Sequence, residues 1–451
     1  MGLEIGIEWL TLIMFGSLLA LLMAGLPLAF VTGGLATVFL FVLGDARALN
    51  IVPSRIFPLM TNYQLSAIPL FIFMAAMLER AGIINEMFDV IYKVLGGVKG
   101  GLASATIIAS TILAAMVGVI GAAVVTMGII ALPAMLRRGY DPKIAMGSIM
   151  AGGTLGILIP PSILAIIYAV VAEQSVGELF IGAVIPGLML SGLYIAYVTV
   201  RCYINPRLGP PIPVEERIST MDKIRLMGNM AAPLMLIVVV LGVIFSGVAT
   251  PVEAAGIGTF GAFIVAAIHR KLDWPTIREA CITTLKASAM VIWIMFGATI
   301  FVGLYVLEGG QDFVEQSLAA TGLGPWGILI VMQIILVVLG MFLDWVGILL
   351  LCVPIFVPII KGLGAAAFGL DSPDDLVLWF GVLYLVNMQM SFLSPPFGYA
   401  LFYLRGVAPA EIPMTDIFKS ALPFLALQIL GLVLAMEFPQ IITWLPRLVY
   451  G

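Results

Sequence analysis

The sequence predicts an all-α polytopic membrane protein with two inverted repeats, and three observations support this fold class. First, 62% of the 451 residues are hydrophobic, only 10% are charged, and the mean hydropathy is +1.17. Soluble domains carry about 25% charged residues, so this composition indicates a chain that lies largely within a bilayer. Second, Gly (48) and Pro (27) are frequent, as is typical of closely packed and interrupted membrane helices. Third, a Pro-Pro pair interrupts an apolar stretch in each half of the chain.

The remaining residue types exclude several classes of function. The net charge of -4 is spread out, and the chain has no basic stripe that would indicate nucleic acid. Cys202, Cys281 and Cys352 are far apart and lack the spacing of metal ligands. The single histidine, His269, lies in a polar connection, which favours an ordinary loop residue. With neither an H-E-x-x-H nor an aspartate-rich metal motif, we expect no enzymatic activity, no catalytic residues and no organic cofactor.

The first 62 residues are interpreted as N-terminal scaffold helices. Glu4 and Glu8 occupy the place where a signal peptide would be basic, so we expect the first apolar segment to be retained. A span needs about 20 apolar residues. The run from Trp9 to Leu43 is therefore long enough for two helices hinged at residues 25–27.

Residues 63–200 are predicted to form a first repeat. A span that opens at Ala67 ends in Glu79-Arg80-Ala81-Gly82, and residues 83–99 read as an amphipathic interfacial helix. A Gly- and Ala-rich apolar stretch follows, then the break at Pro160-Pro161 and a span from Leu179 to Val200.

Adjacent prolines must break a helix, because they remove two backbone donors and push the preceding residue, here Ile159, out of the helical region. In hydrocarbon such a break is tolerated only where the freed carbonyls face protein or a wet cavity. The second break, Ser391 to Gly398, contains Pro395-Pro396. Paired breaks in two halves are the best sequence indication of a transporter's binding site. The simpler alternative is a pair of kinked helices.

Residues 201–286 are interpreted as a basic linker followed by a scaffold helix pair. The connection from Arg201 to Arg225 carries five basic residues, and residues 269–286 carry four Lys or Arg. The turn between the helices of the pair, residues 246–250, has no charge. The positive-inside rule makes the basic side cytoplasmic.

Residues 287–440 are predicted to form a second repeat with the same landmarks. A span ends in Glu308-Gly309-Gly310, an amphipathic stretch follows, and the Pro395-Pro396 break comes later. Pro354 corresponds to Pro133, and Pro423 corresponds to Pro186. An inverted pair is the expectation for secondary carriers.

Several motifs, in order between about residues 25 and 435, resemble one family of membrane subunits. They are Ala67 to Phe71, Arg138-Gly139-Tyr140, Gly153 to Ser162, Ser175 to Phe180, Ile185-Pro186-Gly187, Thr250 to Ala255, and Phe342-Leu343-Asp344. The sequence is similar to the large membrane subunit of tripartite ATP-independent periplasmic (TRAP) transporters.

This resemblance implies an elevator-type secondary transporter with a re-entrant helical hairpin, broken at Pro-Pro, in each repeat. It implies sodium-coupled uptake of a small organic acid across a bacterial or archaeal cytoplasmic membrane. The implied partners are a small four-helix membrane subunit, expected as a separate chain, and a periplasmic substrate-binding protein. An alternative is a sodium-coupled carrier of related architecture that needs no binding protein.

The resemblance also implies sodium ligands, mainly backbone carbonyls, at both breaks. Hard cations prefer oxygen ligands, and unwound helices supply them. The implied ligands of the first break are Gly156, Ile159 and Pro160, with residues 118–123 opposite. Those of the second are Ser391, Ser394 and Phe397, with Gly340 opposite.

One feature departs from the family pattern. Gly121-Ala122-Ala123 replaces a Gly-Ser-Ser of many relatives, so an ion there would use backbone carbonyls or Thr126. The hydroxyl-free version is typical of the branch associated with mannitol, chloroaromatic or 2-oxo-acid uptake.

Individual polar residues have competing interpretations. An intramembrane carboxylate such as Asp344 is a functional hypothesis by default, and we favour ion coupling over a helix-end role. For Glu253, in contrast, a capping box beginning at Thr250 is favoured.

The candidate substrate contacts are Ser162, Asn387 and Arg405. Arg405 could bind a substrate carboxylate through two hydrogen bonds or extend to an interface. Asn387 and Gln389 could line the substrate path or hydrogen-bond another helix.

Overall fold

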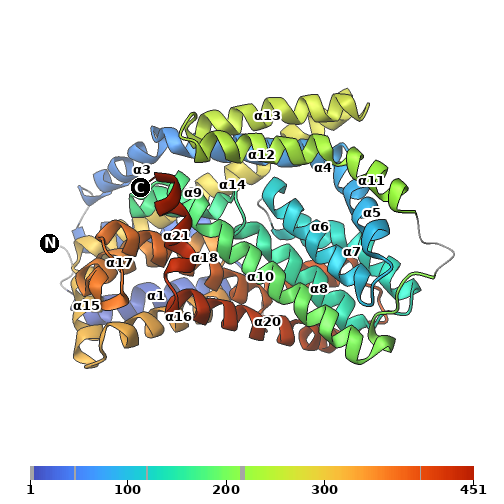
Figure 1. Cartoon of the computed structure of the whole chain (residues 1–451). Coiled ribbons are helices and arrows are strands. Elements are labelled where there is room, and N and C mark those ends of the chain that lie inside the picture. Colours follow the sequence, from blue (N-terminus) through green and yellow to red (C-terminus); the bar gives the residue numbers. More distant parts are fainter. Residues whose placement is uncertain (1–4, 45–46, 118–119, 214–218, 397, 451) are drawn as a thin grey trace.

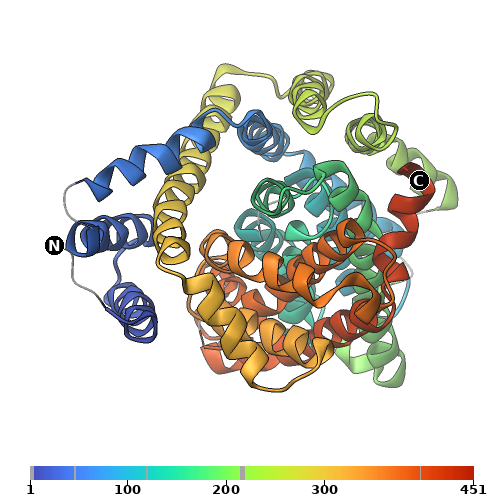
Figure 2. The same ribbon diagram turned by 90° about the vertical axis from the view of Figure 1, so that its left-hand side faces the viewer.

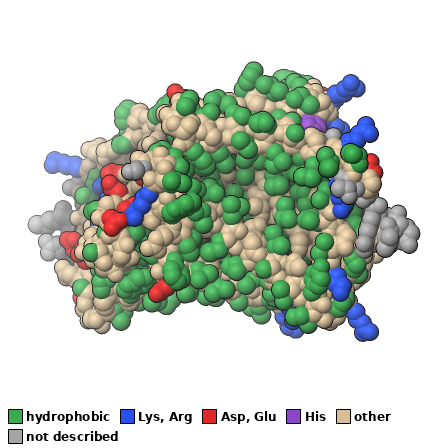
Figure 3. Space-filling model, in the orientation of Figure 1, with side chains coloured by type: hydrophobic (Ala, Val, Ile, Leu, Met, Phe, Trp, Pro, Cys, Tyr) green, Lys and Arg blue, Asp and Glu red, His purple; other side chains and the backbone are tan. Residues whose placement is uncertain are grey.

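The computed structural model describes residues 5–44, 47–117, 120–213, 219–396 and 398–450, and in these ranges the regular elements are all helical. Among these described residues, seven helices are long and apolar enough to cross a membrane, or up to nine if two bent helix pairs each count as one span. Figure 3 shows a broad band of hydrophobic side chains. Visible acidic side chains gather toward its left end, and most visible basic ones toward its right. Together these observations show a multi-pass membrane protein.

The helices outside the two repeats cover the periphery. α1 and α2 pack on each other and α2 packs on α14, while α12, α13 and α4 form a second group (Figure 2). Their bounds, with those of the other helices outside the repeats, are α1 (Ile7–Met23), α2 (Leu28–Gly44), α3 (Ile51–Met60), α11 (Thr220–Asn229), α12 (Ala231–Phe245), α13 (Pro251–Ile268) and α21 (Gln440–Tyr450).

Small residues and aromatic edges join these peripheral helices to the repeats. A Cβ at Gly33 of α2 would lie 3.5 Å from the Cα of Gly297, so the two backbones are in close contact. Phe15 packs edge-on against Phe301 and Tyr305 at centroid distances of 5.6 and 5.2 Å. Close approach at small residues is how membrane helices associate without a hydrophobic driving force.

The two repeats have the same helix order. The helices of the first copy are α4 (Ala67–Arg80), α5 (Ile83–Leu95), α6 (Gly101–Val117), α7 (Ile120–Arg137), α8 (Pro142–Thr154), α9 (Ile163–Ala172) and α10 (Val176–Ile204). Those of the second are α14 (Trp274–Leu307), α15 (Gly310–Ala320), α16 (Pro325–Gly340), α17 (Trp345–Leu363), α18 (Pro373–Leu393), α19 (Tyr399–Val407) and α20 (Met414–Glu437). Short 3-10 helices lie at Ala48–Asn50, Tyr63–Ser66, Leu155–Ile157, Pro206–Leu208 and Ala365–Phe368.

Matched local features support the repeat. A glycine with positive φ, Gly82 or Gly309, begins the short helix α5 or α15. Because a positive φ is strained for other residues, glycine is the natural choice at both corners. In α5 the apolar face is buried, and in α10 and α20 an internal proline recurs at Pro186 and Pro423.

Contacts between the copies are reciprocal. α7 packs on α19, and its counterpart α17 packs on α9. Likewise α8 packs on α20, and its counterpart α18 packs on α10. Such an exchange of partners is what two copies related by a two-fold axis would make, in agreement with the predicted inverted pair.

The helices that flank the first Pro-Pro pair do not form the hairpin predicted there, whereas α18 and α19, which flank the second, pack on each other. α8 and α9, on either side of Pro160-Pro161, do not pack side by side, and Figure 1 shows them toward opposite ends of the molecule. Both instead pack along the long helix α10. The consecutive helices α6 and α7 pack on each other, and so do their counterparts α16 and α17. The first Pro-Pro therefore interrupts a discontinuous helix, because proline dictates a break but not the direction the chain takes after it.

The predicted capping box at Thr250 is confirmed. The Thr250 hydroxyl accepts the backbone N–H of Glu253, and the Glu253 carboxylate accepts the backbone N–H of Thr250 at 2.8 Å. His269 ends α13, where Nδ1 lies 3.0 Å from the Val265 carbonyl.

Candidate transport site

The first break is enclosed by protein. Thr154 to Ser162, which include the predicted ligands Gly156, Ile159 and Pro160, are all buried. The second break runs from the end of α18 to Tyr399. Ser391 and Ser394 are buried there, whereas Phe397 lies outside the described residues. Both Pro-Pro peptide bonds are cis. Burial of the first break fits the requirement that freed carbonyls face protein or a cavity. At the second break, Pro395 is only partly buried and Pro396 is exposed.

The serine hydroxyls at the breaks donate to nearby carbonyls. Ser162 donates to the carbonyl of Ile157 and accepts the N–H of Ala165, and thereby caps α9. Ser394 donates to the carbonyl of Met390 at 2.7 Å, and Ser391 to that of Asn387 at 3.5 Å. Because a hydroxyl has one hydrogen and two lone pairs, each oxygen keeps accepting capacity for a cation but has no hydrogen left for a substrate carboxylate.

A helix junction packs against each break. Gly340, the last residue of α16, lies so close to Ser391 that a Cβ there would overlap the serine side chain. In the first copy, a Cβ at Gly153 would lie 3.3 Å from the backbone nitrogen of Val124, near the start of α7. Of the opposing segment predicted for this break, residues 118–119 lie outside the described residues. The sodium ligands themselves stay a prediction.

A cavity of about 690 Å³ opens beside the α16–α17 connection. Its walls come from the α1–α2 connection, the middle of α14, residues 342–344 and α19. Asp344 lines it and caps α17, since its carboxylate accepts the N–H of Val346 at 3.3 Å. Small-molecule sites typically measure about 300–1,000 Å³, so this cavity has a suitable size. The carboxylate therefore has the helix-end role weighed from sequence, because it caps the start of α17, and it also lines a cavity. Its part in ion coupling stays a prediction.

Two tyrosines four residues apart on α19 complete the polar wall. Tyr399 and Tyr403 line the cavity with ring centroids 6.4 Å apart. The Tyr403 ring also faces the first copy, because a Cβ at Gly121 would lie 3.2 Å from its Cζ atom. Tyr403 therefore lies between the start of α7 and the cavity that Asp344 lines.

The other polar candidates lie away from this cavity. Asn387 donates to the backbone and side-chain oxygens of Gln333 on α16, at 2.9 and 2.7 Å, which is the helix-to-helix alternative. Gln389 is fully buried, and neither of its amide atoms has a hydrogen-bond partner among the described residues. Arg405 donates to the carbonyl of Ile412 at 2.6 Å and is absent from the cavity lining.

Sequence reasoning missed the tyrosines and the α14 wall of the cavity. The signal for the tyrosines was available: a spacing of four puts Tyr399 and Tyr403 on one face of the helix that follows the second break. No comparable pattern marks Trp293, whose place in the wall depends on the packing of α2 against α14.

Comparison with known proteins identifies the family. Residues 15–441 match the family model of the tripartite ATP-independent periplasmic transporter, DctM component. This chain belongs to that family. It is 30% identical to the C4-dicarboxylate TRAP transporter large permease protein of Vibrio cholerae, over 97% of this chain and 98% of the relative. It is 28% identical to the sialic acid TRAP transporter large permease protein of the same organism, over 96% of this chain and 97% of that one.

Solved structures share the fold. The YdaH transporter of Alcanivorax borkumensis superposes with a TM-score of 0.65 at 14% identity, over 95% of this chain and 99% of that chain. MtrF of Neisseria gonorrhoeae, described as one of a class of antimetabolite efflux pumps, gives 0.58 at 13%, over 88% and 85%. The TRAP family membership establishes a transport role for this permease.

Proposed function

We propose that this permease carries out sodium-coupled uptake of a small organic acid across a bacterial or archaeal inner membrane. A periplasmic binding protein delivers the acid, and a separate small four-helix subunit completes the membrane complex. The observation that carries the proposal is the cavity of about 690 Å³ between the α1–α2 connection and the α16–α17 connection, with Asp344 in its wall.

The geometry supports coupling between ion and substrate. Gly340 and Ser391 hold the second break against the residues that lead into Asp344. Sodium bound by carbonyls there would lie close to the cavity wall and would lower the cost of bringing an anion toward Asp344. An isolated buried charge is costly and must be paired. Uptake of the acid would then depend on sodium.

The location of the cavity supports release toward the cytoplasm. Its α14 residues, Ala289 to Ile294, come shortly after the basic segment that ends at Lys286. The positive-inside rule makes that segment cytoplasmic. We therefore propose that this conformation is inward-facing. The reciprocal contacts of the two repeats support an elevator movement of α6–α10 and α16–α20 against the peripheral helices.

Relatives support the proposed partners. This chain covers only 65% of the isethionate TRAP transporter permease protein DctMQ of Oleidesulfovibrio alaskensis and 65% of the sialic acid TRAP transporter permease protein SiaT of Haemophilus influenzae. The additional length of those proteins is sufficient for a second membrane unit. In the proposed complex that unit is a separate chain.

The deciding experiment is reconstitution. Proteoliposomes would contain this permease and its cognate small subunit. The cognate binding protein would be added with the ligand that mass spectrometry finds bound to it. Uptake is expected only with an inward sodium gradient and the binding protein together. Uptake that persists in choline chloride would contradict sodium coupling. Sodium-dependent uptake without the binding protein would favour the binding-protein-independent carrier.

A further inference from the structure

The single histidine of the chain, His269, has an oxygen acceptor at each ring nitrogen. Its Nδ1 atom lies 3.0 Å from the carbonyl oxygen of Val265, one turn back in α13. Its Nε2 atom lies 3.5 Å from a carboxylate oxygen of Glu86, which belongs to α5. The side chains of His269 and Glu86 are 13% and 49% exposed. The ring therefore connects the end of a peripheral helix with a short helix of the first repeat.

The protonation state of the ring decides whether both contacts are favourable. A carbonyl oxygen can only accept, so Nδ1 must carry the hydrogen that the Val265 contact needs. A neutral imidazole has one N–H group, so its Nε2 atom would then turn a lone pair toward the Glu86 carboxylate. The imidazolium has two N–H groups and satisfies both acceptors. Only the charged ring therefore makes the complete connection between α13 and α5.

The end of α13 fixes the position of the ring. Arg270 adopts a positive φ of 56°. Its amide donates to the carbonyl of Ala267, and the amide of Lys271 donates to that of Ala266. This is the Schellman arrangement that ends helices, and it makes His269 the last residue before the chain turns. A cation in the last turn also interacts favourably with the helix dipole. The ring thus lies at the end of α13 that the positive-inside rule makes cytoplasmic.

Among the described residues, Glu86 is the charged group that faces His269. The small pocket that these two side chains line is otherwise apolar, and its other residues are Ile83, Met87, Val90, Met230 and Pro233. α12, which packs on α13, carries no charged residue. On α4, which also packs on α13, Arg80 pairs with Glu279 at 3.1 Å, and Glu79 hydrogen-bonds with a threonine of α7. These charges are therefore engaged elsewhere.

α5 joins the peripheral side of the molecule to the first helix of the proposed moving group. It begins at Gly82, whose positive φ of 73° allows a sharp corner after α4. α5 packs on α4, α6 and α11. Near its other end, the Lys223 ammonium of α11 donates to the Val94 carbonyl at 3.0 Å. α5 is therefore attached to peripheral helices at two places, to α11 through Lys223 and to α13 through His269.

We propose that the contact between His269 and Glu86 makes transport sensitive to the pH of the cytoplasm. Histidine is the side chain whose charge ordinarily changes between about pH 5 and pH 8. In acid the imidazolium donates to Glu86 and holds α5 against α13. As the pH rises through this range the second N–H is lost, and the contact weakens.

This regulation rests on the proposed function, because α5 must turn when α6 moves against the peripheral helices. Fixing α5 against α13 stabilises the present, inward-facing conformation. Since leaving that conformation is a step of every transport cycle, acidification of the cytoplasm slows uptake. A higher pH releases α5 and restores the rate.

Hydrogen exchange of α5 tests the contact without transport. Purified native permease and His269→Gln are compared at the same pH, near pH 5.5 and near pH 8, by mass spectrometry of peptides that cover Ile83–Leu95. At the lower pH the variant is expected to exchange about threefold faster than the native protein, as for the loss of a partly exposed ion pair. At the higher pH this ratio should fall toward one, which also shows that the variant folds. A ratio that is no larger at the lower pH than at the higher pH overturns the inference.

The partner variant and a matched control isolate the pair. Glu86→Gln should accelerate exchange at the lower pH by the same factor, and adding His269→Gln should accelerate it no further, because both changes remove one interaction. Asp89→Asn is the control, since Asp89 is an exposed carboxylate three residues further along α5. An effect of Asp89→Asn as large as that of Glu86→Gln would overturn the inference, because the general charge of α5 would then be responsible.

Uptake tests the regulatory consequence. In proteoliposomes whose permeases face the lumen with their cytoplasmic side, lowering the internal pH from about 8 to about 5.5 should slow sodium-dependent uptake by the native protein about threefold. Uptake by His269→Gln should not respond. An equal response of the two proteins overturns the regulation. Absence of sodium-dependent uptake by the native protein at both pH values instead rejects the proposed function, and the exchange of α5 then decides on the contact by itself.

Discussion

Gly340 packs directly on Ser391, and this contact joins the end of α16 to the second Pro-Pro break. A Cβ at residue 340 would overlap both the Oγ and the Cβ atom of the serine. The absence of a side chain is therefore what allows the α16–α17 pair to reach the break. The same contact brings a proposed sodium ligand close to the connection that leads to Asp344.

Gly340→Ala is expected to destabilise the protein by about 1–3 kcal/mol, the usual cost of overpacking, and to abolish uptake. Thermal unfolding in detergent and proteoliposome uptake measure the two effects. Gly34→Ala is the matched control, because nothing lies within 4 Å of a Cβ at that position. Adding Ser391→Gly to Gly340→Ala should restore the unfolding temperature. A Gly340→Ala protein of normal stability and activity would contradict the contact.

Asp344→Asn is expected to weaken the sodium dependence of uptake while leaving the fold intact. Asparagine retains an oxygen that can cap α17, but it removes the charge that faces the cavity. The half-saturating sodium concentration should rise about tenfold, which corresponds to about 1.4 kcal/mol. Asp312→Asn, at an exposed position on α15, is the control. An unchanged sodium titration of Asp344→Asn would reject the coupling role.

The Asn387–Gln333 pair is predicted to stabilise the packing of α18 on α16 and not to contact substrate. Hydrogen bonds between membrane helices are worth about 0.6 kcal/mol on average and up to about 1.7. A double-mutant cycle with Asn387→Leu and Gln333→Leu should therefore give a coupling energy in this range, measured by thermal or denaturant unfolding. If Asn387→Leu changes the half-saturating substrate concentration and leaves the stability unchanged, Asn387 contacts substrate and the prediction is wrong.

Much of the fold was predictable because its signals are local. Apolar length predicts spans, the Thr250–Glu253 pair predicts a helix start, and each Pro-Pro predicts a break. The repeat was also readable from prolines and glycines at corresponding places, such as Gly82 and Gly309. The direction of the chain after Pro160-Pro161 could not be predicted from the sequence, because it depends on how α9 packs against α10 and α17.

The site was predictable only in part, for the same reason. Asp344 was found because a carboxylate between apolar runs is conspicuous. Nothing in the sequence connects the α1–α2 turn with Trp293, although both line the cavity. Arg405 shows the converse: its charge suggested a substrate contact, whereas tertiary packing directs it to the carbonyl of Ile412.

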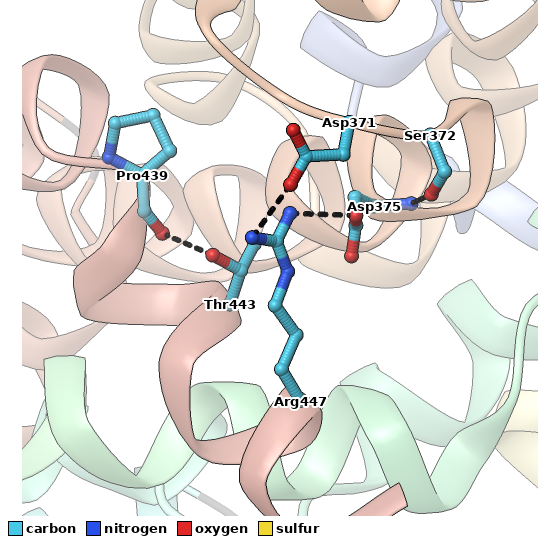
Figure 4. A network of polar contacts seen from close by, with 6 residues as sticks. All are labelled: Asp371, Ser372, Asp375, Pro439, Thr443 and Arg447. Carbon is cyan, nitrogen blue, oxygen red and sulfur yellow. Dashed lines mark hydrogen bonds and ion pairs between the residues drawn. The ribbon is translucent and has the colours of Figure 1, made fainter. Parts of the chain in front are cut away.

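Arg447 is expected to hold the C-terminal helix α21 against the start of α18. Its guanidinium bridges Asp371 and Asp375, each at 2.8 Å, as Figure 4 shows. Tyr450, one turn beyond it, donates to the carbonyl of Ile244 on α12. The helix therefore connects the second repeat with the peripheral helices, and loss of the arginine should loosen that connection.

Arg447→Ala should lower the free energy of unfolding by about 0.5–1 kcal/mol, because exposed ion pairs contribute little even when two carboxylates share one guanidinium. The difference from the native protein should shrink as salt is raised, since the pairs are screened. Hydrogen bonding to Asp375 raises the pKa of Arg447. Its contribution is therefore fully present below the unfolded-state pKa and is lost only in strong alkali, so the difference should stay constant from about pH 7 to pH 10. Denaturant unfolding at several salt concentrations and pH values measures this, with Arg447→Lys as the charge-preserving comparison. A difference that is insensitive to salt would show that the arginine acts through packing instead.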